Sequence, residues 1–471
     1  MLIRVLRYVA LMWILLLSAC SSQQVEIKPG ISMPEKGDLL PAQHWQFSYF
    51  DEPRFNSKVA VLEAGDKHNP PVILIHGLGQ LGMKDWFTVI PDLEKNYHVI
   101  AIDLPGFGNS SASFLRFLPS HYAEVIAAIS KQYINRKAIV IGHSMGGAVA
   151  LRYSNLYGEL VDKLIVVDAA GIIEKSAFIK YIAKFKFGDD LPVFVQNIID
   201  QLNGFSSSMI EAESKPASIT HFLQKNDSAW KLLVSDSPNM NAALSLVEED
   251  FSQAVADLTV PVDIIWGEKD TVAPLRTGKV LNKQLTKARL QVIKGAGHMP
   301  MQSHHYEFIQ ALNIALTEPI ADKQLQQSEQ TSQGDLICND ESNMTYSGRY
   351  DSIELRECSN INLVNITSNR LIISDSVVQI ENLRLTNKGR SLEINESVVT
   401  ITNANISGHH SVLINGSRLD MAGVSIKATG DAVMISNGSW ISASLSDISS
   451  PNYQGVVHGA FYLKHQPLIS E

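Results

Sequence analysis

The segment Gly142-His143-Ser144-Met145-Gly146 constrains the fold of this chain more than any other stretch. A β-branched run, residues 138–141, precedes it and small residues follow it, which predicts a strand, a sharp turn and a helix. Such a turn holds its central Ser in a strained conformation, with the hydroxyl pushed into solvent at the end of a sheet. Glycine is expected at positions 142 and 146 because a side chain there would collide where the helix doubles back against the strand. The backbone N–H of Met145 would then lie at a helix N-terminus and face an oxygen that Ser144 attacks.

The chain around this segment alternates between strand-like and helix-like patterns. Strand-like segments come first at residues 45–50 and 58–63, and helix-like patterns lie at 86–95 and at 120–133, with Ser120 as a cap. Continuous apolar runs, typical of buried parallel strands, follow at residues 72–75, 99–102 and 164–167, and further strand-like segments lie at 262–267 and 290–293. This alternation predicts the α/β class with a doubly wound, mostly parallel sheet, whose chemistry lies at the carboxyl ends of the strands.

The motifs at these strand ends resemble those of the alpha/beta-hydrolase superfamily, over about residues 45–317. They are His-Gly-Leu-Gly at residues 76–79, Asp-x-Pro-Gly-x-Gly-x-Ser at 103–110 and Gly-His-Ser-Met-Gly-Gly at 142–147. The superfamily places an acid after a later strand and a His near the end of the domain, and Asp270 and His298 stand there. The resemblance implies that Ser144 is the nucleophile, His298 the base and Asp270 the orienting acid, in the family's chain order. It also implies an oxyanion hole from the backbone N–H groups of Leu78 and Met145.

Other residues compete for these roles. Asp168 follows the strand at 164–167, where some members of the superfamily carry the acid, but we favour Asp270. Glu268 comes two residues early and Asp263 lies within a strand.

Three further residues near the motifs have structural interpretations. We interpret His76 as a scaffold for the oxyanion loop, His143 as packing in the turn, and Asp103 as a residue that fixes its Gly-rich turn. No Cys or His cluster has metal-ligand spacing and no G-x-G-x-x-G opens a helix, so no cofactor is implied.

The N-terminus predicts export and lipidation. Arg4 and Arg7 precede a short apolar run at residues 9–17, which is typical of a signal peptide over residues 1–19. The residues up to Cys20 resemble a bacterial lipobox, which implies cleavage before Cys20 and lipid on it. Residues 20–44 would be a tether; an uncleaved membrane anchor is the alternative. Because Ser rather than Asp follows Cys20, the resemblance favours a protein anchored in the outer membrane and facing the periplasm.

Charge and cysteine content agree with that location. The net charge of −9 becomes −11 when the signal segment, with two Arg and no acid, is removed. Such a balance argues against nucleic acid and against electrostatic adhesion to anionic lipid, so the lipid would do the anchoring. Lipid would use Cys20, and in an oxidising periplasm Cys338 and Cys358 are then candidates for a disulfide. Two buried free thiols are the alternative.

The chain is long enough for two domains, and its composition changes between them. Within the first, residues 172–255 read as an inserted helical cap, whose apolar side chains would either roof an apolar acyl or aromatic substrate or bury the cap's own face. Residues 318–335 are a Gln- and Ser-rich linker.

Residues 336–471 carry a repeat. A Ser precedes short Val/Ile/Leu alternations at Ser376, Ser397, Ser417 and Ser439, at intervals of 21, 20 and 22 residues. This period predicts an all-β domain built as a parallel β-solenoid, with a β-sandwich as the alternative. It would serve as a spacer or as a surface for a glycan or protein partner.

Together these features predict a lipid-anchored serine hydrolase, esterase- or lipase-like, which cleaves carboxylic esters through an acyl-enzyme. An acyltransferase or a carbon–carbon bond hydrolase could use the same triad. The alternative from another class is a non-catalytic surface protein that binds a glycan or a partner.

Overall fold

The structure is a computed structural model that describes residues 44–111, 115–173, 237–321 and 331–463. The described residues belong to one compact unit, residues 41–471. The predicted signal peptide, Cys20, the tether up to residue 43, most of the predicted cap and half of the predicted linker, residues 322–330, lie outside the described residues. Within them, no helix combines the length and apolarity needed to cross a membrane.

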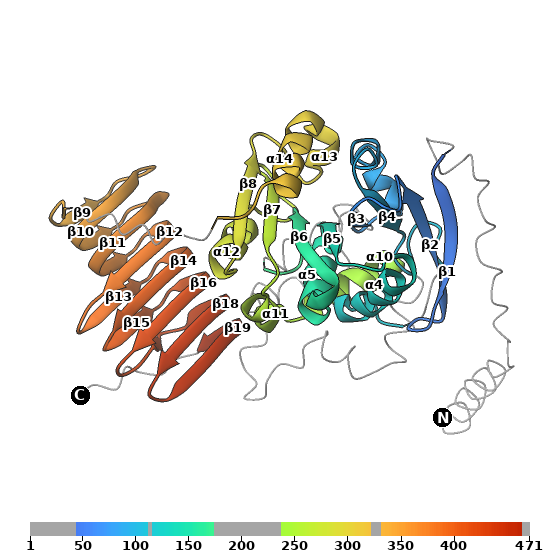
Figure 1. Cartoon of the computed structure of the whole chain (residues 1–471). Coiled ribbons are helices and arrows are strands. Elements are labelled where there is room, and N and C mark those ends of the chain that lie inside the picture. The colour runs from blue at the N-terminus through green and yellow to red at the C-terminus, as the bar shows by residue number, and fades with distance from the viewer. Residues whose placement is uncertain (1–43, 112–114, 174–236, 322–330, 464–471) are drawn as a thin grey trace, which may run out of the picture. The chain divides into compact units, whose positions relative to one another are not determined.

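Residues 44–321, here called the α/β domain, are built on one eight-stranded sheet (Figure 1). The strand order is β1-β2-β4-β3-β5-β6-β7-β8, with β1, β2 and β4 paired antiparallel and the later pairs parallel. The strands are β1 (Gln46–Glu52), β2 (Ser57–Ala64), β3 (Pro71–Ile75), β4 (His98–Ile102), β5 (Ala138–His143), β6 (Val161–Val167), β7 (Val262–Gly267) and β8 (Ala288–Ile293). Each predicted strand is therefore present, and the fold class is confirmed.

Helices pack on this sheet through a continuous apolar core. Ile126 on α4 and Ala148 on α5 are fully buried in it, with Val140 and Val166 of the sheet. The helices are η1 (Gly82–Trp86), α3 (Ile90–Leu93), α4 (Pro119–Tyr133), α5 (Met145–Leu156), η2 (Gly158–Leu160), α10 (Pro238–Glu248), α11 (Ser252–Asp257), α12 (Arg276–Gln284), α13 (Pro300–Ser303) and α14 (His305–Thr317).

Two helix predictions were wrong in detail. The segment predicted as one helix at 86–95 is a 3-10 turn, η1, followed by the four-residue α3. Pro91 has no N–H, so it is tolerated in the first turn of α3, but a helix that starts at residue 86 cannot continue through it. Ser120 does not cap α4, because the helix begins one residue earlier at Pro119, which is pre-organised for a first helical position. The Ser120 hydroxyl instead donates to Glu249.

Residues 331–463, here called the all-β domain, form a second sheet of long strands (Figure 1). Strands β12, β14, β16 and β18 pair in parallel one after another, and so do β11, β13, β15 and β17. The strands are β9 (Leu336–Asn339), β10 (Thr345–Arg356), β11 (Ile361–Ser374), β12 (Val377–Thr386), β13 (Arg390–Asn395), β14 (Val398–Gly408), β15 (His410–Asn415), β16 (Arg418–Ala428), β17 (Val433–Ser436), β18 (Ser439–Ser450) and β19 (Tyr453–Leu463). Parallel pairing of successive repeats is the arrangement that the 20- to 22-residue period predicts.

The repeating Ser residues form a buried ladder at one corner of this domain. The backbone N–H of Ser376 donates to the hydroxyl of Ser397 at 3.0 Å, and that of Ser397 to the hydroxyl of Ser417 at 2.9 Å. The hydroxyls of Ser376, Ser397 and Ser417 each donate to the carbonyl two residues before them, as Ser397 does to Asn395 at 2.6 Å. The Ser439 hydroxyl donates to the carbonyl of Ser436, three residues before it. The recurring Ser is thus a turn residue whose hydroxyl hydrogen-bonds both a carbonyl of its own repeat and an N–H of the preceding repeat.

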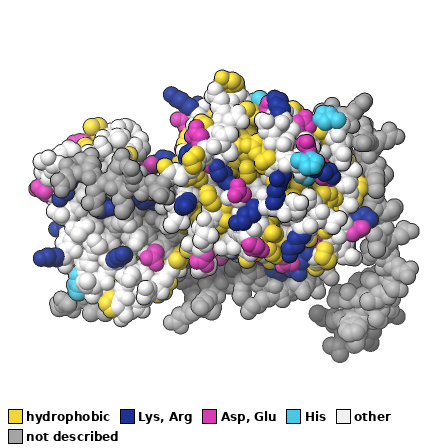
Figure 2. All heavy atoms as spheres, in the orientation of Figure 1, with side chains coloured by type: hydrophobic (Ala, Val, Ile, Leu, Met, Phe, Trp, Pro, Cys, Tyr) yellow, Lys and Arg dark blue, Asp and Glu magenta, His cyan; other side chains and the backbone are white. Residues whose placement is uncertain are grey.

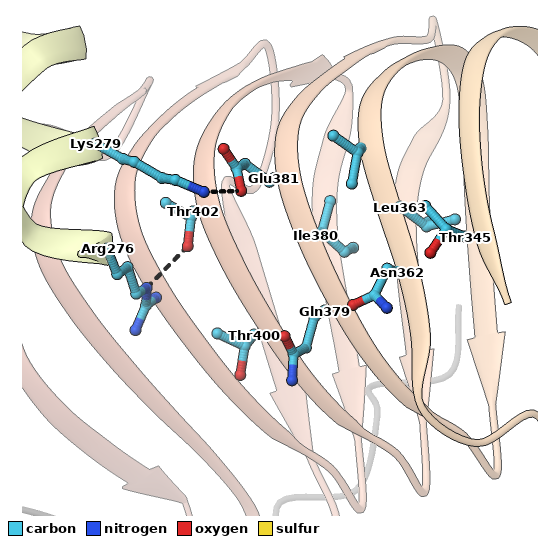
Figure 3. A pocket seen from close by; sticks show the side chains of 11 residues that line it. Arg276, Lys279, Thr345, Asn362, Leu363, Gln379, Ile380, Glu381, Thr400 and Thr402 are labelled. Carbon is cyan, nitrogen blue, oxygen red and sulfur yellow. Dashed lines mark hydrogen bonds and ion pairs between the residues drawn. The ribbon is translucent and has the colours of Figure 1, made fainter. Parts of the chain in front are cut away.

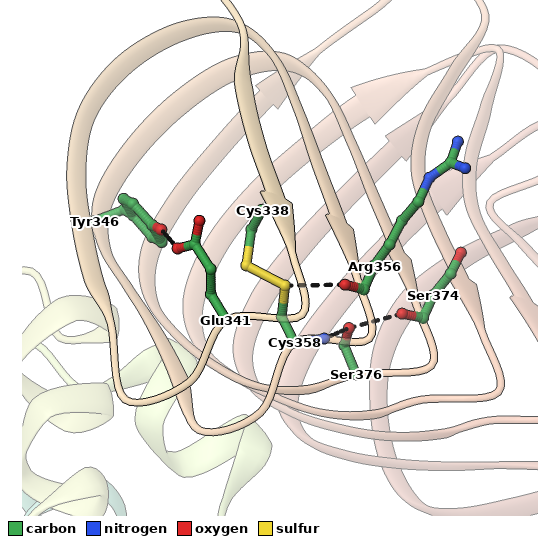
Figure 4. The surroundings of a disulfide bond; sticks show 7 residues. All are labelled: Cys338, Glu341, Tyr346, Arg356, Cys358, Ser374 and Ser376. Atoms are coloured by element: carbon green, nitrogen blue, oxygen red, sulfur yellow. Dashed lines mark hydrogen bonds between the residues drawn. A yellow bond between two sulfur atoms is a disulfide. The ribbon is translucent and has the colours of Figure 1, made fainter.

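A disulfide closes the first coils (Figure 4). Cys338 is bonded to Cys358, and the backbone N–H of Cys358 donates to the hydroxyl of Ser376 at 2.9 Å. Cys358 therefore stands where later coils have the ladder Ser. The two Cys that the sequence left after Cys20 are paired with each other.

Helix α12 contacts the outer face of the all-β domain (Figure 3). Arg276 donates to the Thr402 hydroxyl at 2.9 Å and to Asp420 at 3.0 Å, and Lys279 pairs with Glu381 at 2.6 Å. Beside these contacts lies a groove of about 370 Å³, lined also by neutral polar side chains: Thr345, Asn362, Gln379 and Thr400. Such groups could hydrogen-bond a sugar, but the glycan or protein partner stays a prediction.

Charges of both signs are interspersed on the face of the molecule that Figure 2 shows. This face carries no large patch of a single sign.

Candidate active site

Ser144 sits on the sharp turn between β5 and α5. Its backbone has φ 54° and ψ −122°, a strained conformation for a residue with a side chain. A Cβ on Gly142 would lie 2.2 Å from the carbonyl oxygen of Gly146, where α5 passes close to β5, as the sequence predicts. Gly146 is required for a different reason, since its Cβ would lie 2.3 Å from the carbonyl oxygen of His76, beyond β3.

The three residues proposed as a triad lie in one chain of hydrogen bonds. The Ser144 hydroxyl is 2.8 Å from Nε2 of His298, and Nδ1 of His298 is 2.8 Å from Oδ2 of Asp270. Asp270 follows β7 and His298 follows β8, so neighbouring strand ends bring these distant residues together. An imidazole between a hydroxyl and a carboxylate can take a proton from the first while the second stabilises its charge.

The expectation that the Ser144 hydroxyl is pushed into solvent was wrong. Ser144 is 3% exposed, because His298 and the loop after β3 lie against it. In this low-dielectric setting, hydrogen bonds to a developing charge are stronger than in water.

The loop proposed to carry the oxyanion hole passes directly over Ser144. A Cβ on Gly77 would lie 3.0 Å from the Ser144 Cβ, so Leu78, the next residue, is close to Ser144. Met145 is the first residue of α5, where the N–H groups of a helix have no partner within it. Both proposed donors therefore flank Ser144.

The competing acids have other partners. Glu268 accepts from the backbone N–H of Gly295 at 2.8 Å. Asp263 forms ion pairs with Lys163 and with Arg289. Asp168, at the end of β6, accepts from the backbone N–H of Gly267 at 2.8 Å and is in hydrogen-bonding contact with Asp270 rather than with His298.

His143 contributes more than packing. Its Nε2 is 2.7 Å from the carbonyl oxygen of His298, to which it donates, and the two rings lie 5.0 Å apart. Burial lowers the pKa of His143 to about 3, so the ring is uncharged. His143 therefore helps to hold the backbone of His298. The two residues are 155 positions apart, and no sequence signal could have joined them.

His76 and Asp103 support the loops around the site, as expected. Nε2 of His76 accepts from the backbone N–H of Leu104 at 3.0 Å. Asp103 accepts from the N–H groups of Met83 and Asn109, and burial raises the pKa of its carboxyl. Asp103 thus joins the turn after β3 to the turn after β4.

Among the residues that the structure describes, no group of three or more His, Cys, Asp or Glu side chains could hold a metal ion.

Comparison with known proteins identifies the domain. A family model for the alpha/beta hydrolase fold matches residues 70–304. These residues belong to the alpha/beta-hydrolase superfamily. The superfamily resemblance of the strand-end motifs is thereby confirmed, and the matched range spans all three residues of the hydrogen-bonded chain.

Relatives of several activities cover about half of this chain. Lipase 3 of Moraxella sp. (strain TA144) is 27% identical over 249 residues, which cover 52% of this chain and 76% of the lipase. The 2-hydroxy-6-oxo-6-(2'-aminophenyl)hexa-2,4-dienoic acid hydrolase of Metapseudomonas resinovorans is 27% identical over 257 residues, or 53% of this chain and 84% of that enzyme. The crystal structure of a hydrolase from Pseudomonas aeruginosa PA01 aligns with a TM-score of 0.44 and 17% identity, covering 58% of this chain and 98% of that one.

Proposed function

We propose that this alpha/beta-hydrolase cleaves carboxylic esters through an acyl-enzyme on Ser144. The observation that carries the proposal is the hydrogen-bonded chain Ser144–His298–Asp270, with both distances at 2.8 Å. The lipase among the relatives supports an ester or lipid substrate. A protein that only binds a partner would not need these three side chains in register.

In the proposed reaction, Oγ of Ser144 attacks the ester carbonyl carbon while Nε2 of His298 takes its proton. The carbonyl oxygen becomes an oxyanion and accepts from the N–H groups of Leu78 and Met145. The C–O bond of the ester then breaks, and the alcohol leaves with the proton from His298. Water, deprotonated by His298, attacks the acyl-enzyme, and the carboxylic acid departs as Ser144 regains its proton.

Labelling with a fluorophosphonate, which reacts with activated serines, tests the proposal. The chain from residue 21 onward is compared with its Ser144→Ala and Ser154→Ala variants. Ser154 is a suitable control because it is a buried Ser on the same helix, α5. We expect wild type and Ser154→Ala to label equally and Ser144→Ala not to label. Labelling of the Ser144→Ala variant would contradict the assignment of Ser144 as the nucleophile.

The substrate is tested with p-nitrophenyl esters of rising chain length. We propose an apolar acyl or aromatic substrate, and turnover should then rise with chain length. Because one relative hydrolyses a dienoic acid, a 2-hydroxy-6-oxo-dienoate is assayed beside the esters. Faster turnover of the dienoate than of any ester would favour carbon–carbon bond hydrolysis. Transfer of the acyl group to an added alcohol in preference to water would favour an acyltransferase.

We also propose that the protein is anchored by lipid on Cys20, in the outer membrane and facing the periplasm. The proposal is supported by the lipobox-like segment that ends at Cys20 and by the disulfide between Cys338 and Cys358, which suits an oxidising compartment. In a bacterial host, wild type should sediment with outer membranes and incorporate a clickable palmitate analogue. Cys20→Ala should do neither; membrane association that persists in it contradicts the proposal.

A further inference from the structure

Asp168 is a fully buried carboxyl that the proposed reaction does not use. It follows β6 and lies next to the end of β7, with 0% of the residue exposed. One of its oxygens, Oδ1, accepts from the backbone N–H of Gly267 at 2.8 Å. The other, Oδ2, has no hydrogen-bond donor among the described residues. A buried carboxylate oxygen without a donor is costly.

Asp270 lies beside Asp168 and already has its own donors. Its Oδ1 accepts from the N–H groups of Val272 and Ala273, at 2.8 and 3.0 Å, and its Oδ2 accepts from His298. The Asp270 side chain is 0% exposed. With three donors around it, Asp270 is the better stabilised anion of the two.

Two carboxyl groups in hydrogen-bonding contact cannot both be ionised at low cost, and one of them then keeps a proton. We propose that Asp168 is a positioning residue that stays protonated in the working enzyme and donates its O–H to the Asp270 carboxylate. This bond satisfies Oδ2 of Asp168 and gives Asp270 a fourth donor.

The surroundings of Asp168 agree with this assignment. Burial, together with the charge of Asp270 and its hydrogen bond, raises the pKa of Asp168 well above the ordinary value. The other titratable side chains around the pair are His143 at the end of β5 and His298 after β8. His143 is uncharged, since burial lowers its pKa to about 3. The N–H of Gly267 favours the ionised form of Asp168, but burial and the charge of Asp270 outweigh it.

In the reaction, the O–H of Asp168 would change how strongly Asp270 stabilises a proton on His298. An O–H bond to Asp270 withdraws part of its negative charge and fixes the carboxylate plane. Without that bond, Asp270 would hold a proton on His298 more tightly, and the base would be less available at neutral pH.

The test compares three substitutions, and the inference rests on the proposed serine hydrolase function. Asp168→Asn keeps an acceptor for Gly267 and an N–H donor for Asp270, and Asn tolerates the backbone φ of 43° at this position. Asp168→Gly also tolerates that φ but removes both groups. Asp162→Asn is the matched control, because it removes an exposed acid at the other end of β6.

The readout is the acid limb of the kcat/KM profile, which reports protonation of the catalytic base in the free enzyme. We expect Asp168→Asn to keep the midpoint of this limb and to retain kcat within about threefold, because its amide mimics a protonated carboxyl. Asp168→Gly should move the midpoint to higher pH and lower kcat by about tenfold. If Asp168 is instead ionised in wild type, Asp168→Asn removes a negative charge near His298 and moves the midpoint to lower pH. That shift would overturn the proposal.

A second measurement does not depend on turnover. The infrared spectrum of wild type at neutral pH should contain the C=O stretching band of a buried protonated carboxyl, which Asp168→Asn lacks and Asp162→Asn keeps. Absence of the band overturns the inference even when fluorophosphonate labels Ser144. Failure of labelling with the band present would instead reject the proposed function alone.

Discussion

At the scale of single residues, His143 of the Gly142–Gly146 segment supports the candidate active site through a bond to the backbone of His298. It donates to the carbonyl oxygen of His298, and only its uncharged form is compatible with a ring buried beside His298. Because the ring must stay neutral, folding and protonation of His143 compete.

This competition predicts a pH dependence of stability. The pKa of His143 is about 3 in the folded protein and near the ordinary value of about 6.5 when unfolded. Between these values the unfolded state binds one more proton, so the free energy of unfolding falls as the pH falls, by about 1.4 kcal/mol per pH unit. We expect His143→Gln, which does not titrate, to have a slope smaller by that amount between pH 6 and 4, measured by urea unfolding. His68→Gln is the control, since that ring is 95% exposed. Equal slopes in wild type and His143→Gln would contradict the assignment.

At the scale of elements, the sequence predicted those features that depend on residues close together in the chain. The turn at Ser144, the buried strands and the ladder Ser residues depend on neighbours in sequence or on a regular repeat, so the sequence was enough to predict them. Gly146 is different, because the atom it makes room for is the carbonyl oxygen of His76. The contact of Asp168 with Asp270 and the bond from His143 to His298 also join residues about a hundred or more positions apart. Such contacts follow from the sheet order, which a single sequence does not specify.

The two helix errors have different causes. Apolar spacing predicted one helix at 86–95, but Pro91, a signal within the segment itself, prevents a helix that starts at residue 86 from continuing past it. Ser120 had the chemistry of a cap, yet Glu249, which is distant in sequence, uses its hydroxyl.

The Ser ladder makes a prediction for the all-β domain. Ser397→Ala removes the acceptor of the buried Ser376 N–H and the donor to the partly buried Asn395 carbonyl. We expect a loss of about 1–3 kcal/mol in the stability of this domain and faster hydrogen exchange at the Ser376 amide. The control is Thr400→Ala, three residues further along on β14, where the side chain lines the outer groove. An effect of Ser397→Ala no larger than that of Thr400→Ala would show that the ladder does not stabilise the coils.

At the scale of the whole molecule, α12 links the candidate active site to the all-β domain. This helix begins six residues after Asp270, and its Arg276 bonds to Thr402, Ile401 and Asp420. Ala422 of β16 is buried in the same apolar core as Val280 of α12. These contacts imply that the two domains unfold together.

Removing the Arg276 contacts should separate the two unfolding events. Arg276→Met keeps the aliphatic stem but removes the donors, and it leaves the partly buried Asp420 without this cation. We expect calorimetry to show one main transition in wild type and two in Arg276→Met, because breaking a partly buried, hydrogen-bonded ion pair costs about 1.5–3 kcal/mol at the contact. Lys283→Met, an exposed position in the last turn of α12, removes the same charge without these contacts and should melt as wild type does. If Arg276→Met also melts in one transition, unchanged in midpoint, the contact does not couple the domains. The loop that carries Asp270, before α12, would then be stable independently of the all-β domain.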